Sequence, residues 1–244
     1  MQSQATLLGL PFELRTQILT HLLVTHYDPP INVFTDVPRH RSDYNIVLPR
    51  TCPASPAVSL LLVNRQINAE VKQCLEDLKA RKEDLVELDV MVRGYWLYPT
   101  FTRLPLLQRD VASPLNITLR AFSAEMFLSP CTVGFLTDLL RVFFLFGSRL
   151  GSGIAAADET PALYEISKLT VKLEFHDLYT PSTWSHAAAA LSEELQRLVL
   201  SGWMWPHADS VRFVAKFRHV NIDRTWVVRE GEHTANLLEE WRRR

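Results

Sequence analysis

Four separated segments of the chain alternate between apolar and polar residues. Their apolar positions are Val86, Leu88, Val90 and Val92; Leu115, Ile117, Leu119 and Ala121; Leu169, Val171, Leu173 and Phe175; and Val211, Phe213, Ala215 and Phe217. Successive side chains of a β-strand point to opposite faces, so this pattern predicts four strands with one buried and one solvated face. On the solvated face we expect Lys172, Lys216 and Arg218. A fifth strand is predicted at Thr225–Arg229, after a turn at Asn221–Asp223.

Helical patterns lie between and after these strands. Apolar residues recur at steps of three and four in Thr132–Ser148 and in Trp184–Trp203, and Glu232–Trp241 predicts a closing helix. Helices that connect neighbouring strands favour parallel, right-handed pairing. We therefore predict an α+β fold, in which a mixed β-sheet has helices on one face and solvent on the other.

Upstream of the strands, Val58–Lys82 predicts one long helix, because neither Gly nor Pro interrupts it. Its length would be roughly 35 Å. Apolar residues recur in it at steps of three and four and form one stripe along the helix. They are Leu60, Val63, Ile67, Val71, Cys74, Leu75 and Leu78. A stripe of this kind is typical of a helix that packs along one face.

A shorter helix is predicted in Leu7–Val24, with Pro11 in its first turn. Leu14, Ile18 and Leu22 form its apolar stripe. A helix this short is marginal alone. We expect its stripe to dock on the stripe of Val58–Lys82.

The region Tyr27–Pro56 between these two helices is rich in proline and predicts a long surface loop. Short strands are predicted within it at Ile31–Phe34 and Tyr44–Leu48. The predicted organisation is a helical segment with a Pro-rich insert at 1–82 and a sheet region at 83–244. No composition break separates the two, so we expect one continuous unit.

Composition limits the classes of partner. Of the 244 residues 47% are hydrophobic and 22% charged, and the net charge is −1, so no general basic field attracts nucleic acid or an anionic membrane. The most apolar stretch, Val133–Leu145, contains two charges and is too short to span a bilayer. Cys52, Cys74 and Cys131 form no CxxC pair, which favours a reducing intracellular compartment, cytoplasmic or nuclear.

Motifs for catalysis are weak. The eight histidines lack the spacing of a helical metal pair, so we predict no metal, no cofactor and no catalytic residue. Gly151-Ser152-Gly153 lacks the lysine of a phosphate-binding loop. His176 and Asp177 are adjacent at a predicted strand end, where neighbouring side chains point apart.

Two segments carry a resemblance to a known family. The first is Leu10-Pro11-Phe12-Glu13-Leu14-Arg15, followed by Ile18 and Leu22, and the second is Leu61–Glu70, LLVNRQINAE. Together they resemble F-box-like fungal proteins of mostly unknown function, over about the first third of the chain. The resemblance implies docking on a Skp1-type adaptor of a ubiquitin ligase through Leu10, Pro11, Ile18 and Leu22. It also implies that the C-terminal part holds a protein client.

Two interpretations of function therefore stay open. One is a non-enzymatic interaction module, an F-box-like substrate adaptor whose client binds the open sheet face at Lys216 and Arg218. The other is a small-molecule-binding or enzymatic domain with its site in the loops at the strand ends. A helix pair that forms only a core would give the same apolar pattern. Exposure of Leu10, Ile18 and Leu22 discriminates between these interpretations.

Overall fold

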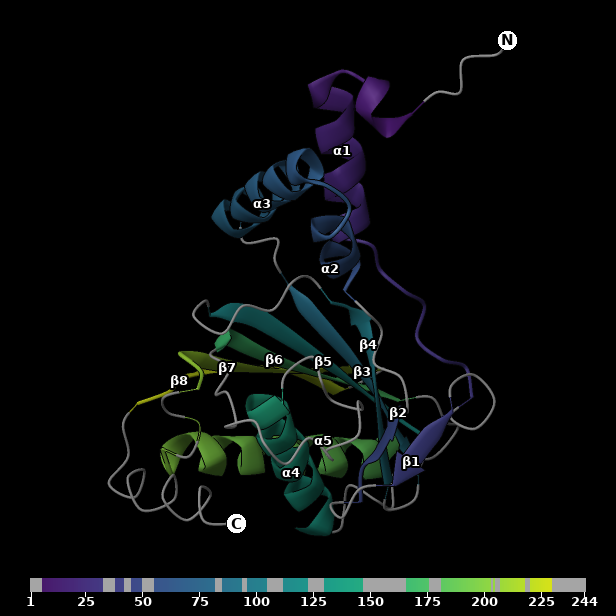
Figure 1. Ribbon diagram of the computed structural model, residues 1–244. Coiled ribbons are helices and arrows are strands. Elements are labelled where there is room, and N and C mark those ends of the chain that lie inside the picture. Colours follow the sequence, from purple (N-terminus) through teal and green to yellow (C-terminus); the bar gives the residue numbers. More distant parts are fainter. Residues whose placement is uncertain are drawn as a thin grey trace.

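The computed structural model describes residues 6–32, 38–41, 45–49, 55–81, 85–93, 96–104, 112–122, 130–146, 166–175, 181–202, 204, 207–217 and 220–229. Within them the predicted α+β fold is confirmed, with N-terminal helices beside a six-stranded mixed sheet (Figure 1). No helix in the described ranges is long and apolar enough to cross a membrane.

The sheet has the strand order β4-β3-β5-β6-β7-β8. Its strands are β3 (Val86–Arg93), β4 (Trp96–Arg103), β5 (Ser113–Ala121), β6 (Ile166–Phe175), β7 (Ser210–Phe217) and β8 (Val220–Val227). The four inner strands are parallel, and each edge strand pairs antiparallel to its neighbour. The helices α4 (Pro130–Phe146) and α5 (Pro181–Leu200) connect β5 to β6 and β6 to β7, so the predicted parallel crossovers are present.

The two faces of the sheet follow the predicted alternation. Apolar residues of the inner strands pack with α4 and α5 into one hydrophobic core, and Figure 1 shows both helices beneath the sheet. Val171, Leu173 and Phe213 are buried in this core, whereas Lys172 and Lys216 are exposed on the opposite face, which we call the open face. The side chain of Phe217, like Arg218, lies outside the described residues.

Two predictions at the sheet edges are wrong or incomplete. Asn221–Asp223 is not a turn but part of β8, where Asp223 pairs with Arg212 on β7 at 2.6 Å. The hairpin connection instead lies between the paired residues Phe217 and Val220. The edge strand β4 was not predicted, because Pro99 interrupts its pattern; proline is tolerated at sheet edges, where one side of the strand needs no ladder hydrogen bond.

A separate lobe, which we call the helical lobe, comprises η1 (Leu7–Gly9), α1 (Phe12–Leu23), α2 (Pro56–Leu61) and α3 (Arg65–Ala80). Its core is distinct from that of the sheet and consists of Leu19, Leu23, Ala57, Ile67, Val71, Cys74, Leu75 and Leu78. The lobe lies on the side of the sheet away from α4 and α5 (Figure 1).

The single helix predicted over Val58–Lys82 is wrong, because the chain turns between α2 and α3. Asn64 begins α3 as its N-cap, and its Oδ1 accepts a hydrogen bond from the backbone N–H of Ile67 at 2.9 Å. The Nδ2 of Asn68 donates to the carbonyl of Leu61 at 2.7 Å and so fixes the end of α2. C-terminal to this turn, the predicted buried stripe from Ile67 to Leu78 is confirmed.

The chain after α1 crosses the open face of the sheet. The N–H of Tyr27 donates to the carbonyl of Thr102 at 2.7 Å, and the guanidinium of Arg120 donates to the carbonyl of Pro30 at 2.8 Å. We call residues 24–30 the connector. The connector therefore lies at the β3–β5 side of the open face, where Asp89 and Arg120 are buried, whereas Lys172 and Lys216 on β6 and β7 are exposed.

The Pro-rich region contains a short two-stranded sheet. Its strands are β1 (Arg39–Arg41), which was not predicted, and β2 (Val47–Pro49), which overlaps the strand predicted at Tyr44–Leu48. Ile31 is 91% exposed and in no strand, so the prediction there is wrong at its start. Asn32 is likewise exposed and in no strand, whereas residues 33–34 of that prediction, the segment 151–153, His176-Asp177 and Glu232–Trp241 lie outside the described residues.

Candidate docking surface on the helical lobe

The helix α1 has two neighbouring faces, and the predicted stripe is not the one that packs against α3. Arg15, Leu19 and Leu23 point inward and are buried. The predicted inward residues Leu14, Ile18 and Leu22 are 46%, 39% and 39% exposed. These three residues recur every fourth position, so they form one apolar stripe along the outer side of the helix.

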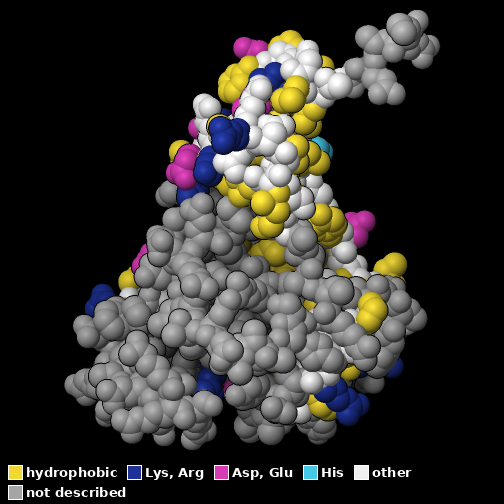
Figure 2. All heavy atoms as spheres, viewed as in Figure 1, with side chains coloured by type: hydrophobic (Ala, Val, Ile, Leu, Met, Phe, Trp, Pro, Cys, Tyr) yellow, Lys and Arg dark blue, Asp and Glu magenta, His cyan; other side chains and the backbone are white. Residues whose placement is uncertain are grey.

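Exposed apolar side chains gather on this lobe. Those on or beside α1 and α2 are Leu8, Phe12, Leu14, Ile18, Leu22, Val58, Leu62 and Val63, which we call the lobe surface. Figure 2 shows hydrophobic side chains on the viewed side of the lobe. Single exposed apolar residues are ordinary, but a concentration on one small element is typical of an interaction site.

The four residues that the resemblance assigns to adaptor docking lie outside the buried core of the lobe. Pro11 is exposed as the residue preceding α1, and Leu10 is half-buried at the end of η1. Together with Ile18 and Leu22, they lie on the lobe. None of the four is fully buried, so a docking partner has access to them.

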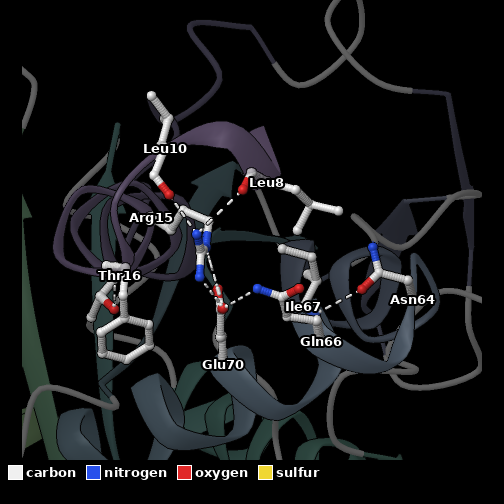
Figure 3. A network of polar contacts seen from close by, with 9 residues as sticks. Leu8, Leu10, Arg15, Thr16, Asn64, Gln66, Ile67 and Glu70 are labelled. Atoms are coloured by element: carbon white, nitrogen blue, oxygen red, sulfur yellow. Dashed lines mark hydrogen bonds and ion pairs between the residues drawn. The ribbon is translucent and has the colours of Figure 1, made fainter. Parts of the chain in front are cut away.

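A buried ion pair fixes the geometry of this surface (Figure 3). The guanidinium of Arg15 on α1 contacts both carboxylate oxygens of Glu70 on α3, with Nη2–Oε1 at 2.7 Å and Nε–Oε2 at 3.0 Å. The Nε2 of Gln66 adds a third donor to Glu70 at 3.0 Å. Both charged residues are more than nine-tenths buried, so the bidentate pair fixes the rotation of α1 against α3.

The same arginine also holds the turn that precedes α1. Its Nη1 donates to the carbonyl of Leu8 within η1 and to that of Leu10, the C-cap of η1. The hydrogen bonds from Arg15 lower the pKa of Glu70, and those to Glu70 raise the pKa of Arg15, so both stay charged. The pair thus links the two sequence segments that carry the resemblance. The sequence predicted both segments but not the ion pair between Arg15 and Glu70. The signal for it was one charged residue of opposite sign within each apolar segment.

The open face of the sheet is charged but locally neutralised. Arg120 pairs with Asp89 at 2.6 Å, and Arg212 pairs with Asp223. Lys216 is exposed on β7, and the other predicted client-binding residue, Arg218, lies outside the described residues. These pairs leave no extended run of unpaired basic charge among the described residues of this face.

The described part of the chain offers no candidate metal site. It contains no cluster of three or more His, Cys, Asp or Glu side chains arranged to hold a metal ion. Burial raises the pKa of the Cys74 thiol, which packs inside the lobe and therefore stays protonated.

No known protein family's sequence pattern matches this chain, no curated protein matches it, and no solved structure matches it.

Proposed function

We propose that the protein is an interaction module, in which the lobe surface docks on a Skp1-type adaptor of a ubiquitin ligase, in the cytoplasm or nucleus. The observation that carries this proposal is the exposed apolar stripe of Leu14, Ile18 and Leu22 on α1. The helix buries a different face against α3, so this stripe is not needed for the core. A helix used only to build a core would leave such residues polar. The resemblance of the two lobe segments to F-box-like proteins supports the identity of the partner.

The physical basis of docking is burial of apolar area. Removing these side chains from water contributes about 25 cal/mol per Å2, and an amphipathic helix laid against an apolar groove is a recurring recognition mode. The Arg15–Glu70 pair would preorganise the stripe, so that little order has to be gained on binding.

Co-purification with a recombinant Skp1-type protein tests this proposal. The double variant Ile18→Gln, Leu22→Gln keeps good helix formers and should remain folded while losing the partner. The matched control is Gln17→Ala, His21→Ala on the polar side of the same helix, which should retain it. The proposal fails if the wild-type chain does not bind the adaptor, or if the outward variant binds as the control does.

The second half of the proposal places a protein client on the open face of the sheet, at Lys216 and Arg218. Its support is the exposure of Lys216 on the open face. Reversing both charges to Glu should abolish capture of the client and leave the unfolding temperature unchanged. Capture that survives the reversal would mean that these side chains are merely solvated.

A further inference from the structure

A small trough lies on the open face where the connector crosses the sheet. Its volume is about 210 Å3, and His26 and Pro29 of the connector line it together with polar side chains of β3, β4, β5 and β6. This volume is below the range of about 300–1,000 Å3 for drug-sized ligands. The trough therefore suits a ligand of only a few heavy atoms, or the end of a longer one.

Most charged groups of the trough are already engaged. The Nε2 of His26 lies 3.2 Å from Oε2 of Glu87. Arg120 holds Asp89 through two hydrogen bonds of 2.6 Å, and these two side chains are buried as the trough's floor. Glu174 at the rim also has an intrachain interaction.

Lys172 is the exception. It is exposed on β6 and forms neither a hydrogen bond nor an ion pair with any residue in the described ranges. Its in-register neighbours are Thr118 on β5 and Val214 on β7. Asn116 precedes Thr118 by two residues, so both point to the open face beside Lys172.

We propose that this trough binds a small monocarboxylate, with Lys172 as the charge partner and Thr118 and Asn116 as hydrogen-bond donors. An ammonium, a hydroxyl and a carboxamide supply the donors that the two oxygens of a carboxylate accept. Glu87, Asp89 and Glu174 line the same trough, so a ligand with two or more negative charges is disfavoured. The apolar part of the ligand lies toward Pro29, which lines the trough from the connector. The site is separate from the lobe surface, so the failure of either proposal leaves the other standing.

A carboxylate can come from a free acid or from the C-terminus of a peptide, and the probes distinguish these sources. We choose butyrate, its neutral analogue butyramide, and N-acetylglycylglycine as the peptide end. Backbone amide shifts of Asn116, Thr118 and Lys172 in the full chain report binding by NMR titration. Butyrate and N-acetylglycylglycine should shift these amides, and butyramide should not. Equal affinity of the two acids indicates recognition of the carboxylate alone, and tighter binding of the dipeptide indicates a peptide C-terminus.

Variants assign the interaction to Lys172. Lys172→Met removes the charge and keeps the side-chain length, and it should weaken binding about tenfold or more, the usual effect of a lost charge-assisted hydrogen bond. Lys216→Met is the matched control, because it makes the same change at an exposed position of the open face outside the trough. Both variants should keep the unfolding temperature, since both side chains are exposed. The proposal is overturned if no acid shifts these amides, if butyramide shifts them equally, or if Lys172→Met binds as the wild type does.

Discussion

Arg15 and Glu70 show, at the scale of single residues, how a buried charge can specify an arrangement. Removing one partner leaves the other charge buried without compensation, whereas replacing both by apolar residues removes the desolvation cost as well. We expect Arg15→Leu to lower the unfolding temperature clearly, and Arg15→Leu with Glu70→Leu to recover much of that loss. A double-mutant cycle of thermal unfolding measures the coupling. Additive effects of the two substitutions would contradict the pair.

His207 provides a pH-dependent test at the same scale. Its ring is 1% exposed and stacked on Phe144, with 4.6 Å between ring centroids, and its Nε2 has no hydrogen-bond partner in the described structure. Burial lowers the pKa of His207 below the ordinary value of 6.5. Below that value the unfolded chain binds a proton that the folded chain does not, so acid favours unfolding.

The free energy of unfolding should therefore fall as the pH drops below about 6.5, by at most about 1.4 kcal/mol per pH unit from this residue. Urea unfolding at pH 7.5 and 5.5 measures the slope. His207→Phe should flatten it, while His186→Gln, at an exposed position of α5, should not. An unchanged slope in His207→Phe would show that the ring is accessible to protons in the folded chain.

At the scale of elements, α3 supports the lobe through its buried side. Ile67 is 1% exposed in the lobe core, whereas Lys72 is exposed on the same helix. Truncating a buried isoleucine costs about 2–5 kcal/mol through lost burial and the cavity left behind. Ile67→Ala should lower stability by an amount in this range and Lys72→Ala by less than about 0.5 kcal/mol, as measured by denaturant unfolding. Similar losses from both would mean that α3 packs on another side.

The elements also show what the sequence could and could not predict. The alternation of apolar and polar residues located the four inner strands, because burial of one face of a sheet makes every second residue of each strand apolar. It missed β4, where Pro99 breaks the pattern. The stripe of α1 was misassigned for a different reason. Leu14, Ile18 and Leu22 are uniformly apolar, whereas the inward stripe contains Arg15, whose burial depends on a partner 55 residues away.

The same limit applies to the candidate site. The resemblance marked Leu10, Pro11, Ile18 and Leu22, and the structure leaves these positions accessible, but periodicity alone predicted that two of them would be buried. The break before Asn64 could not be inferred from the apolar residues around it, since a cap depends on a backbone hydrogen bond and not on hydrophobicity. The trough needed the fold, because its residues come from the connector and four separate strands.

For the whole molecule, the lobe core and the main sheet core share no residue, which predicts two units of stability. The lobe core contains few side chains, whereas the sheet core extends over six strands and two helices. Among the described residues, the connector that follows the lobe contacts the sheet through hydrogen bonds to β4 and β5 and through His26 and Glu87 on β3. A small core with few links to its neighbour is typical of a region that opens before the rest unfolds.

Native-state hydrogen exchange tests this expectation in the full chain. Ile67→Ala should reduce protection of the amides of α1 and α3 and leave those of β5 and β6 unchanged, because the lobe opens without the sheet. Ile117→Ala, in the centre of the sheet core, should reduce protection of β5 and β6 while the lobe exchanges at its original rate. A loss of protection shared equally by both regions in either variant would show that the two cores unfold as one cooperative unit.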